Sequence, residues 1–279
     1  MKNELTFALI TGASCGLGKH YAIELAKRGN NVLLVAKKNE DLPQLSEFIT
    51  KTYNVASFYF ETDLTNIHSL EKMIIWVNSS YSVNILINNV GAGGTAKFEQ
   101  VSPNYINNII QLNIRALTYI THQLLPNLKA TKKPSFVLNV SSMAAFCPMG
   151  YKTVYPASKK YIQFFSEGLN YELHDKNVTV ATVFPGPMKT NADVSERIEK
   201  QGFMIKKLLV TPKIVAKVSL EKLFSGKTFI IVGMANKINY LLLKIVPTSL
   251  IAPLLAKTFK KELTDNSISY ESAFNHSRI

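Results

Sequence analysis

Short runs of valine, isoleucine and leucine recur along the chain, and segments with helical spacing of apolar residues separate most of them. The runs are nearly continuous, which is typical of parallel strands that are covered on both faces. Expected strands fall at residues 5–10, 31–36, 56–61, 83–87, 136–140, 178–184 and 229–232. Expected helices fall at residues 18–28, 41–53, 67–79, 103–128 and 155–174. This repetition predicts right-handed crossovers and an α/β fold, with a doubly wound, mainly parallel seven-stranded sheet between two layers of helices.

The chain shows no change of composition that would mark a linker before about residue 190, so its 279 residues are expected to form a single domain. Residues 190–227 interrupt the strand and helix rhythm and are expected to be a substrate-binding loop with helices. Residues 234–261 are expected to form basic, apolar C-terminal helices. Residues 262–279 are polar and are expected to be a loosely ordered tail.

Positive charge is concentrated near the C-terminus. The chain has 32 basic and 19 acidic residues, and residues 200–261 contain twelve lysines and one acid, Glu221. Nucleic-acid binding would need a motif or aromatic residues interleaved in a basic groove, and neither is evident, so no nucleic-acid partner is expected. A basic, apolar region indicates an acidic ligand or peripheral contact with an anionic membrane surface. Covering the core and forming a homo-oligomer contact remain open as roles of the same region.

Other features bear on the compartment. No run reaches the roughly 20 apolar residues that cross a bilayer, and residues 5–10 are too short for the core of a signal peptide. The two cysteines, Cys15 and Cys147, are too few for disulfides to stabilise a chain of this length, which suggests a reducing compartment. The histidines are scattered singly, so no metal site is expected. These features favour a cytoplasmic protein, with peripheral membrane association as an option.

A glycine-rich turn follows the first expected strand and leads into a helix. Glycine lets the backbone turn tightly and approach a pyrophosphate, whose negative charge is favoured at a helix N-terminus. The spacing of Gly12, Gly16 and Gly18 resembles the cofactor loop of the classical short-chain dehydrogenase/reductase (SDR) family. The resemblance implies a Rossmann-type fold, with NAD(P) bound by Thr11, Gly12, Ser14, Cys15, Gly16, Leu17 and Gly18. Cys15 replaces the serine, arginine or lysine that is more usual in the family.

The end of the second expected strand bears on the choice of nucleotide. An acid there would bond the ribose 2′-hydroxyl of NAD, but the strand ends at Ala36, followed by Lys37 and Lys38. These lysines suit a 2′-phosphate, so NADP(H) is favoured over NAD(H), unless they are only solvated turn residues. The resemblance also implies that Asp63 and Leu64 touch the adenine ring.

Two more loops are similar to family motifs. The segment Asn88-Asn89-Val90-Gly91 resembles the family's Asn-Asn-Ala-Gly, with Val90 as a departure, and implies cofactor contacts from Asn89, Val90 and Gly91. The segment Pro185-Gly186-Pro187-Met188-Lys189-Thr190 resembles the family's Pro-Gly-Pro-x-x-Thr. It implies contacts with the nicotinamide half from Pro185, Gly186, Met188 and Thr190.

Tyr155 and Lys159 are four residues apart and therefore share one face of a helix, while Pro156 requires that the helix start nearby. A tyrosine with a pKa of about 10 transfers protons poorly near neutrality. Lys159 is therefore expected to lower the pKa of Tyr155 by stabilising its phenolate. Together with Asn113 and Ser142, these residues match the family's catalytic tetrad.

The resemblance implies that NADPH delivers a hydride to a carbonyl carbon, while Tyr155 protonates the oxygen and Ser142 orients it. Lys159 would also hold the nicotinamide ribose, and Asn113 would hold a water that relays protons to Lys159. The apolar C-terminal region, with Gly233 and Asn236, looks like the lipid-oriented ketoacyl and ketosphinganine reductases of the family. The expected function is an NADPH-dependent oxidoreductase that reduces a lipophilic ketone or 3-oxoacyl-type substrate to a secondary alcohol. The alternative is a non-catalytic NADP-binding sensor or scaffold.

Overall fold

The expected strands all form, and they pair in parallel in one sheet. A computed structural model describes residues 5–38, 41–173, 176–188 and 208–264, and within them the strand order is β3-β2-β1-β4-β5-β6-β7. The strands are β1 (Thr6–Thr11), β2 (Asn31–Ala36), β3 (Ser57–Glu61), β4 (Ser82–Asn88), β5 (Ser135–Val140), β6 (Val178–Phe184) and β7 (Phe229–Ile231). The chain runs outward from β1 to β3 and then returns to place β4 on the other side of β1. Parallel sheets bind ligands at such a reversal, outside the carboxyl ends of the strands.

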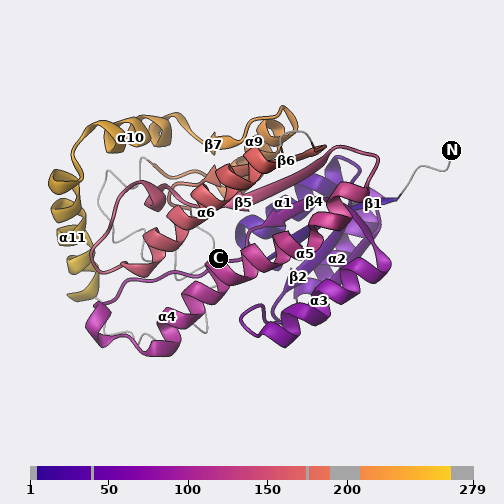
Figure 1. Cartoon of the computed structure of the whole chain (residues 1–279), viewed down its shortest axis with the longest axis horizontal. Coiled ribbons are helices and arrows are strands. Elements are labelled where there is room, and N and C mark those ends of the chain that lie inside the picture. The colour runs from indigo at the N-terminus through magenta and orange to yellow at the C-terminus, as the bar shows by residue number, and fades with distance from the viewer. Residues whose placement is uncertain (1–4, 39–40, 174–175, 189–207, 265–279) are drawn as a thin grey trace.

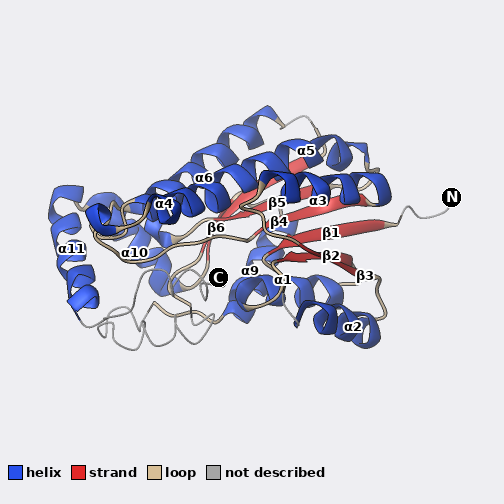
Figure 2. Ribbon diagram, turned by 90° about the horizontal axis from the view of Figure 1, so that it is seen from below, coloured by secondary structure: helices blue, strands red, loops and turns tan. Residues whose placement is uncertain are grey.

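Helices cover both faces of the sheet, as Figure 2 shows. One face carries α1 (Gly16–Lys27), α2 (Asp41–Tyr53) and α9 (Pro212–Phe224), and the other carries α3 (Ile67–Ser80), α5 (Leu117–Ala130) and α6 (Val154–Glu172). Each layer encloses its own cluster of buried apolar side chains. The two clusters explain why most strand sequences are apolar on both sides, since β1, β2, β4, β5 and β6 contribute side chains to both. The predicted Rossmann-type, doubly wound sheet is confirmed.

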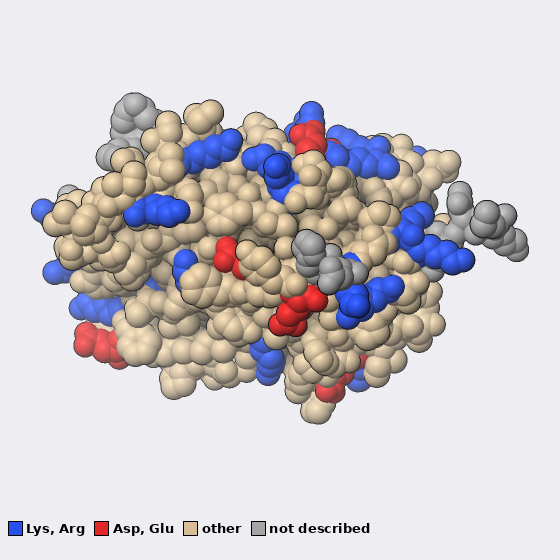
Figure 3. Space-filling view, turned by 45° about the horizontal axis from the view of Figure 1, so that its top comes forward, with Lys and Arg blue, Asp and Glu red and all other residues tan. Residues whose placement is uncertain are grey.

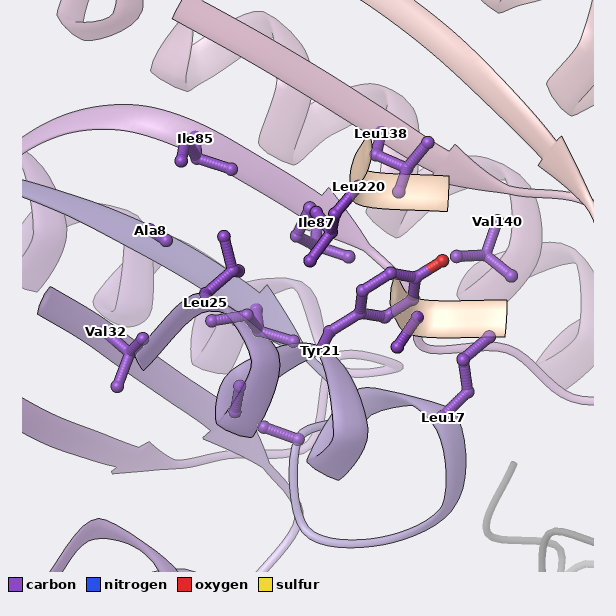
Figure 4. Packing of buried hydrophobic residues seen from close by; sticks show 14 of the residues in the cluster. Ala8, Leu17, Tyr21, Leu25, Val32, Ile85, Ile87, Leu138, Val140 and Leu220 are labelled. Carbon is purple, nitrogen blue, oxygen red and sulfur yellow. The ribbon is translucent and has the colours of Figure 1, made fainter. Parts of the chain in front are cut away.

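Helix α9 lies within the region expected to bind substrate and packs on the core. Residues 212–224, which fall within the expected loop at 190–227, pack against α1 and the sheet. The Tyr21 hydroxyl lies 2.8 Å from Ser219 Oγ, and Leu220 is fully buried. In Figure 4, Tyr21 lies among the labelled residues Leu17, Val140 and Leu220. The apolar face of α9 is therefore part of the core, and residues 189–207 lie outside the described part of the chain.

The expected helix at 103–128 forms in three pieces. Helix α4 (Pro103–Ile110) continues into a π-helical turn, η2 (Gln111–Ala116), which runs on into α5. A π turn inserts an extra residue into the helix and re-aims the side chains within it. Here the turn carries the buried side chain of Asn113.

The C-terminal helices lie at one end of the molecule in Figure 1. They are α10 (Met234–Ile245) and α11 (Thr248–Thr264), as expected for residues 234–261. Helix α11 extends three residues into the expected tail, and residues 265–279 lie outside the described part. A short turn, η3 (Met143–Phe146), follows β5 and packs against α10, and another, η1 (Phe98–Gln100), precedes α4. Within the described residues, no helix combines the length and apolar character that a bilayer span requires.

Candidate active site

Thr11 joins the glycine loop to the loop after β4. Its hydroxyl oxygen accepts hydrogen bonds from the backbone N–H groups of Asn89 (3.0 Å) and Val90 (3.1 Å). The Asn89 side chain returns a bond to the Thr11 carbonyl oxygen at 3.0 Å. Since β1 and β4 are neighbours, these bonds hold two of the expected cofactor loops together at the carboxyl edge of the sheet.

The glycine loop leaves no space for side chains. Gly12 has a φ of +68°, and a Cβ there would lie 2.9 Å from Asn89 Nδ2. A Cβ on Gly18 would lie 2.0 Å from the Gly12 carbonyl oxygen. The loop is therefore packed against the start of α1 in a way that only glycine permits.

The start of α1 retains hydrogen-bond capacity suited to a pyrophosphate. Cys15 precedes the helix and its side chain makes no capping hydrogen bond, so the first-turn N–H groups have no side-chain cap. Among the described residues, the buried Asn89 Oδ1 also has no hydrogen-bond partner. Ser14 is buried, and the Leu17 side chain packs into the core, so Leu17 offers a ligand its backbone. The loop fits a dinucleotide.

Lys37 and Asp63, expected at opposite parts of the adenosine site, form an ion pair of 3.1 Å. Burial acts to raise the pKa of Asp63, but hydrogen bonds from Thr65 and the contact with Lys37 outweigh it and lower the pKa. The pair is partly exposed, so its attraction is weak and Lys37 can exchange partners. Lys38 is exposed, and Leu64 is buried in the core. The structure thus brings Lys37, Lys38 and Asp63 together at one end of the sheet edge, with Leu64 beneath.

Tyr155 is the second residue of α6 and lies in its first turn, as the position of Pro156 requires. Its hydroxyl is hydrogen-bonded to Ser142, which also accepts a bond from the Ala144 N–H at 3.1 Å as the cap of η3. The neighbouring Ser141 is buried and donates to the Lys159 carbonyl at 2.7 Å, so it ties β5 to α6. The geometry therefore places Ser142, rather than Ser141, beside the tyrosine.

Lys159 is buried one turn further along α6. Its Nζ lies 5.7 Å from the centre of the Tyr155 ring and donates to the Val140 carbonyl at 3.0 Å. Gly91 borders the same space, because a Cβ there would lie 3.1 Å from Nζ and 3.0 Å from Asn113 Oδ1. Lys159, Tyr155 and Asn113 therefore meet at the loop after β4.

Asn113 holds that loop in place. Its Oδ1 accepts from the Ala92 N–H at 2.8 Å, and its Nδ2 donates to the Ala92 carbonyl and to Ser158 Oγ, each at 2.9 Å. Both amide hydrogens are therefore used by the protein. These bonds give the Asn113 side chain a positioning role, and the expectation that Asn113 holds a water stays a prediction.

The electrostatics of Tyr155 differ from expectation. Burial raises the pKa of Tyr155, and the hydrogen bond from Ser142 opposes this without overcoming it. Lys159 does not contribute to this shift, and its own burial lowers its pKa to about 8, so the stabilisation of the phenolate by Lys159 stays a prediction. A lysine that is close to half neutral near pH 8 gives the phenolate less stabilisation than a full ammonium.

Several residues that sequence reasoning missed support the site. A Cβ on Gly93 would lie 2.5 Å from the Tyr155 ring, so this glycine lets the loop after β4 cover the tyrosine. Behind the site, Asn88 donates to Asn139 at 2.8 Å, and Asn139 to Ser166 at 2.8 Å, which links β4, β5 and α6. A polar residue in an otherwise apolar strand, such as Asn139, is a signal that could have revealed this network.

The loop after β6 is described only as far as Met188. The Pro185 carbonyl accepts from the Met143 N–H at 2.9 Å, which places the loop beside η3. Gly186 contacts the buried Asn236, since a Cβ there would lie 2.3 Å from Asn236 Oδ1. Met188 packs against the core beneath α1 and α9, and Thr190 lies outside the described residues.

The fold and the site define a dinucleotide-binding protein with a buried lysine beside a tyrosine and a serine. The family model described as short chain dehydrogenase matches residues 6–201. The chain belongs to the short-chain dehydrogenase family.

Similar proteins differ in the activity that their names state. Hydroxysteroid dehydrogenase-like protein 1 of Gallus gallus is 32% identical over 200 residues, which cover 71% of this chain and 60% of that protein. Very-long-chain 3-oxoacyl-CoA reductase of Anas platyrhynchos is 29% identical over 273 residues, 91% of this chain and 80% of that protein. The human inactive hydroxysteroid dehydrogenase-like protein 1 is 33% identical over 181 residues, 64% of this chain and 54% of its own length. The chain thus spans only about 60% of the length of several relatives.

Solved structures share the fold. A 7beta-hydroxysteroid dehydrogenase superposes with a TM-score of 0.81 at 22% identity, covering 90% of this chain and 96% of that one. A short-chain dehydrogenase from Sphingobium yanoikuyae in complex with NADPH superposes with a TM-score of 0.73 at 27% identity, covering 87% and 96%.

Proposed function

We propose that the protein is an NADPH-dependent oxidoreductase that reduces a lipophilic ketone, of the 3-oxoacyl type, to a secondary alcohol. The observation that carries the proposal is the meeting of Ser142, Tyr155 and Lys159 beside a glycine loop that fits a dinucleotide. Strand β5 leads to the serine and α6 carries the other two, so all three lie at the carboxyl edge of the sheet, where parallel sheets bind ligands.

A nicotinamide held by the glycine loop and the loops after β4 and β6 would supply the hydride, with its electron pair, that the carbonyl carbon needs. Tyr155 then donates its phenolic proton to the carbonyl oxygen, which becomes the alcohol hydroxyl, and the tyrosine recovers a proton from solvent. Burial raises the pKa of Tyr155, so the tyrosine holds its proton at neutral pH and gives it up readily only when the ammonium of Lys159 favours the phenolate. Ser142 donates a hydrogen bond to the same oxygen as negative charge develops on it.

Lys159 and Asn113 act on this pair from one side. Lys159 in its ammonium form stabilises the phenolate that Tyr155 leaves behind, and it offers further N–H donors to the ribose of a bound nucleotide. Asn113 fixes the backbone at Ala92, and with it the loop that borders both side chains. Pro185, Gly186 and Met188 would form the nicotinamide side, and Thr190, which the family motif assigns to the same side, lies outside the described residues.

A preference for NADP(H) over NAD(H) is part of the proposal. Ala36 ends β2 without an acid, and Lys37 and Lys38 follow it. Lys37 pairs with Asp63 through an exposed contact that a 2′-phosphate can outcompete, because phosphate carries more charge than a carboxylate. The Sphingobium yanoikuyae relative, solved with NADPH, supports this choice.

The proposed substrate class rests on a match that covers most of the chain. The duck relative, whose name states very-long-chain 3-oxoacyl-CoA reduction, aligns along 91% of this chain, including the C-terminal helices beyond the family match at residue 201. Helix α10 packs on η3, which follows Ser142, so apolar residues of α10 lie close to the reacting end of the site.

The proposal is tested by following NADPH absorbance with a panel of 3-oxoacyl, sphingoid and steroid ketones. Tyr155→Phe is expected to lower kcat by about 10²-fold or more, because the proton donor is lost, with NADPH affinity unchanged. Tyr171→Phe, a change at an exposed tyrosine on the same helix, is the matched control and should retain full activity. Near wild-type turnover in Tyr155→Phe would discredit the assignment.

A non-catalytic NADP-binding sensor or scaffold is the second candidate, and the relatives whose names include "inactive" favour keeping it. Such a protein would bind NADPH, as detected by quenching of its fluorescence, and oxidise it with no member of the ketone panel. Turnover with any member that depends on Tyr155 decides for the enzyme.

A further inference from the structure

We propose that α10 and the start of α11 dock on an anionic membrane surface through one apolar face. This outward face comprises Met234, Ile238, Leu241, Leu242 and Ile245 of α10, together with Leu250 and Leu254 of α11. The surface lies outside the proposed catalytic site, and the inference does not depend on the proposed reaction.

The outward face follows the helical repeat. Its α10 members recur at intervals of four, three, one and three residues, which keeps them on one side of a helix. All five are more than half exposed, from 53% for Ile238 to 77% for Ile245.

Helix α10 meets the core through a different side. Tyr240 and Leu243 pack against a buried cluster around Phe184, and Asn236 is fully buried. Packing against the core therefore explains the apolar residues on the side of Tyr240 and Leu243, but not those of the outward face. A helix that is apolar on two sides needs a second apolar environment, and a stripe this large on a soluble surface marks an interaction site.

Charge identifies the environment. Residues 234–261 contain five lysines and no acid, and Lys237 and Lys244 lie seven residues apart along one edge of the outward face. Figure 3 shows basic side chains set in largely uncharged surface at the end of the molecule that α10 and α11 occupy in Figure 1, with acidic atoms at the lower edge of that end. Apolar residues bordered by lysines are the pattern of interfacial helices, in which the ammonium groups reach lipid phosphates.

A second copy of the chain fits this face less well. Pairing two outward faces brings the lysines of both copies together, and α10 and α11 up to residue 261 have no carboxylate to neutralise them. Anionic headgroups supply that neutralisation, so the lipid surface is the occupant that satisfies both the charges and the apolar side chains.

The docking helices border the proposed active site. Tyr240 of α10 packs on Phe146 of η3, with ring centres 4.6 Å apart. Ala256 of α11 lies against Gly150, and the ring of Phe259 lies 4.6 Å from Lys152 Nζ. The surface is therefore one packing layer from the segments that precede Tyr155 and follow Ser142, where a lipophilic substrate would leave the membrane.

The test is co-sedimentation of the full chain with phosphatidylcholine vesicles, with and without phosphatidylserine, at low and high salt. The protein is expected to pellet with the anionic vesicles at low salt and to be released by high salt. Ile245→Ser is expected to weaken binding by about tenfold, and Lys244→Glu by about fivefold or more.

Matched controls use equally exposed residues of other helices. Ile75→Ser on α3 and Lys129→Glu on α5 should leave vesicle binding unchanged. NADPH binding by every variant shows that it is folded, and turnover of a water-soluble ketone tests the proposed function separately.

Two results would overturn the proposal. One is absence of binding to anionic vesicles at low salt, or equal losses in the test and control variants. The other is a dimer in solution that Ile245→Ser dissociates while vesicle binding is unaffected, which would assign the face to a second copy.

Discussion

Two glycines in the loop after β4 set the positions of the proposed catalytic side chains. Gly91 borders Lys159 Nζ and Asn113 Oδ1, and Gly93 lies against the ring of Tyr155. Neither position has room for a methyl group without displacing a neighbour. The loop thus lets Lys159, Asn113 and Tyr155 approach it closely because these two positions have no side chains. The Asn-Asn-x-Gly pattern indicates this role for Gly91 but not for Gly93.

Gly93→Ala is expected to lower kcat and to leave NADPH affinity nearly unchanged. The new Cβ would lie 2.5 Å from the Tyr155 ring, so the ring must move away from Ser142. Steady-state kinetics and cofactor titration separate the two effects. Gly168→Ala on α6, where nothing lies within 4 Å, is the control, and it should raise stability by about 0.5–1 kcal/mol with activity unchanged. Equal activity in both variants would contradict the packing argument.

Lys159 predicts a dependence of stability on pH. Burial lowers its pKa from 10.5 to about 8, whereas in the unfolded chain the lysine keeps its proton up to about the ordinary value. Between these values the unfolded state binds more protons than the folded state, so stability rises with pH. Urea denaturation is expected to show a gain of about 1 kcal/mol from about pH 8 to about pH 9. The gain should be absent in Lys159→Met, and its persistence there would assign it to another group.

At the scale of elements, two stretches contain detail that the sequence pattern does not predict, namely residues 103–128 and helix α9. Apolar spacing predicts a continuous helix over 103–128, because the segments before and after the π turn are both helical and the chain does not leave the helix between them. Its presence at Asn113 follows from tertiary bonds to Ala92 and Ser158, which no local pattern encodes. Helix α9 lies in the stretch that is expected to bind substrate, and its buried positions pack on α1 and the sheet through contacts that local sequence does not encode.

Leu220→Ala is expected to cost about 2–5 kcal/mol of unfolding free energy, because the leucine is fully buried between α9 and the sheet. Lys217→Ala, on the exposed side of α9, should cost little. Chemical denaturation of both variants measures the difference. A stability of Leu220→Ala close to wild type would show that α9 is not part of the core.

Asn236 predicts a coupling between α10 and the loop after β6. Its Nδ2 donates to the Leu208 and Val232 carbonyls at 3.1 and 3.0 Å, and its Oδ1 faces Gly186. Asn236→Ala leaves these groups unpaired and is expected to cost about 1–3 kcal/mol and to raise the KM for NADPH. Asn239→Ala, on the same helix, is the control. A stability loss with an unchanged KM would limit Asn236 to a structural role.

For the whole molecule, the sequence predicts the architecture well because strand identity depends on local composition. Every expected strand overlaps an observed one, and the sheet follows from their repetition. Ion pairs and pKa shifts are harder to predict from the sequence, since they depend on which side chains the fold brings together and buries. Lys37 meets Asp63 only through the pairing of β2 with β3, and the pKa of Tyr155 rises because the folded chain removes water from it.

Binding of the nucleotide should stabilise the whole fold. NADPH at 100 times its dissociation constant is expected to add about 2.7 kcal/mol to the unfolding free energy, and NADH at the same concentration less. Thermal unfolding with each nucleotide measures this. Lys38→Ala should narrow the difference between the two nucleotides, and Lys51→Ala on α2 should not. A larger stabilisation by NADH would overturn the proposed preference.

The order of segments has a practical consequence for redesign. The loops expected to hold the adenosine half and pyrophosphate come from residues 11–91, the serine, tyrosine and lysine come from the stretch 135–172, and the loop on the nicotinamide side follows β6. The choice between NADP(H) and NAD(H) and the carbonyl chemistry are therefore expected to depend on separate stretches of the chain. Grafting a different β2 to β3 segment should re-specify the electron donor and leave the proton donor untouched.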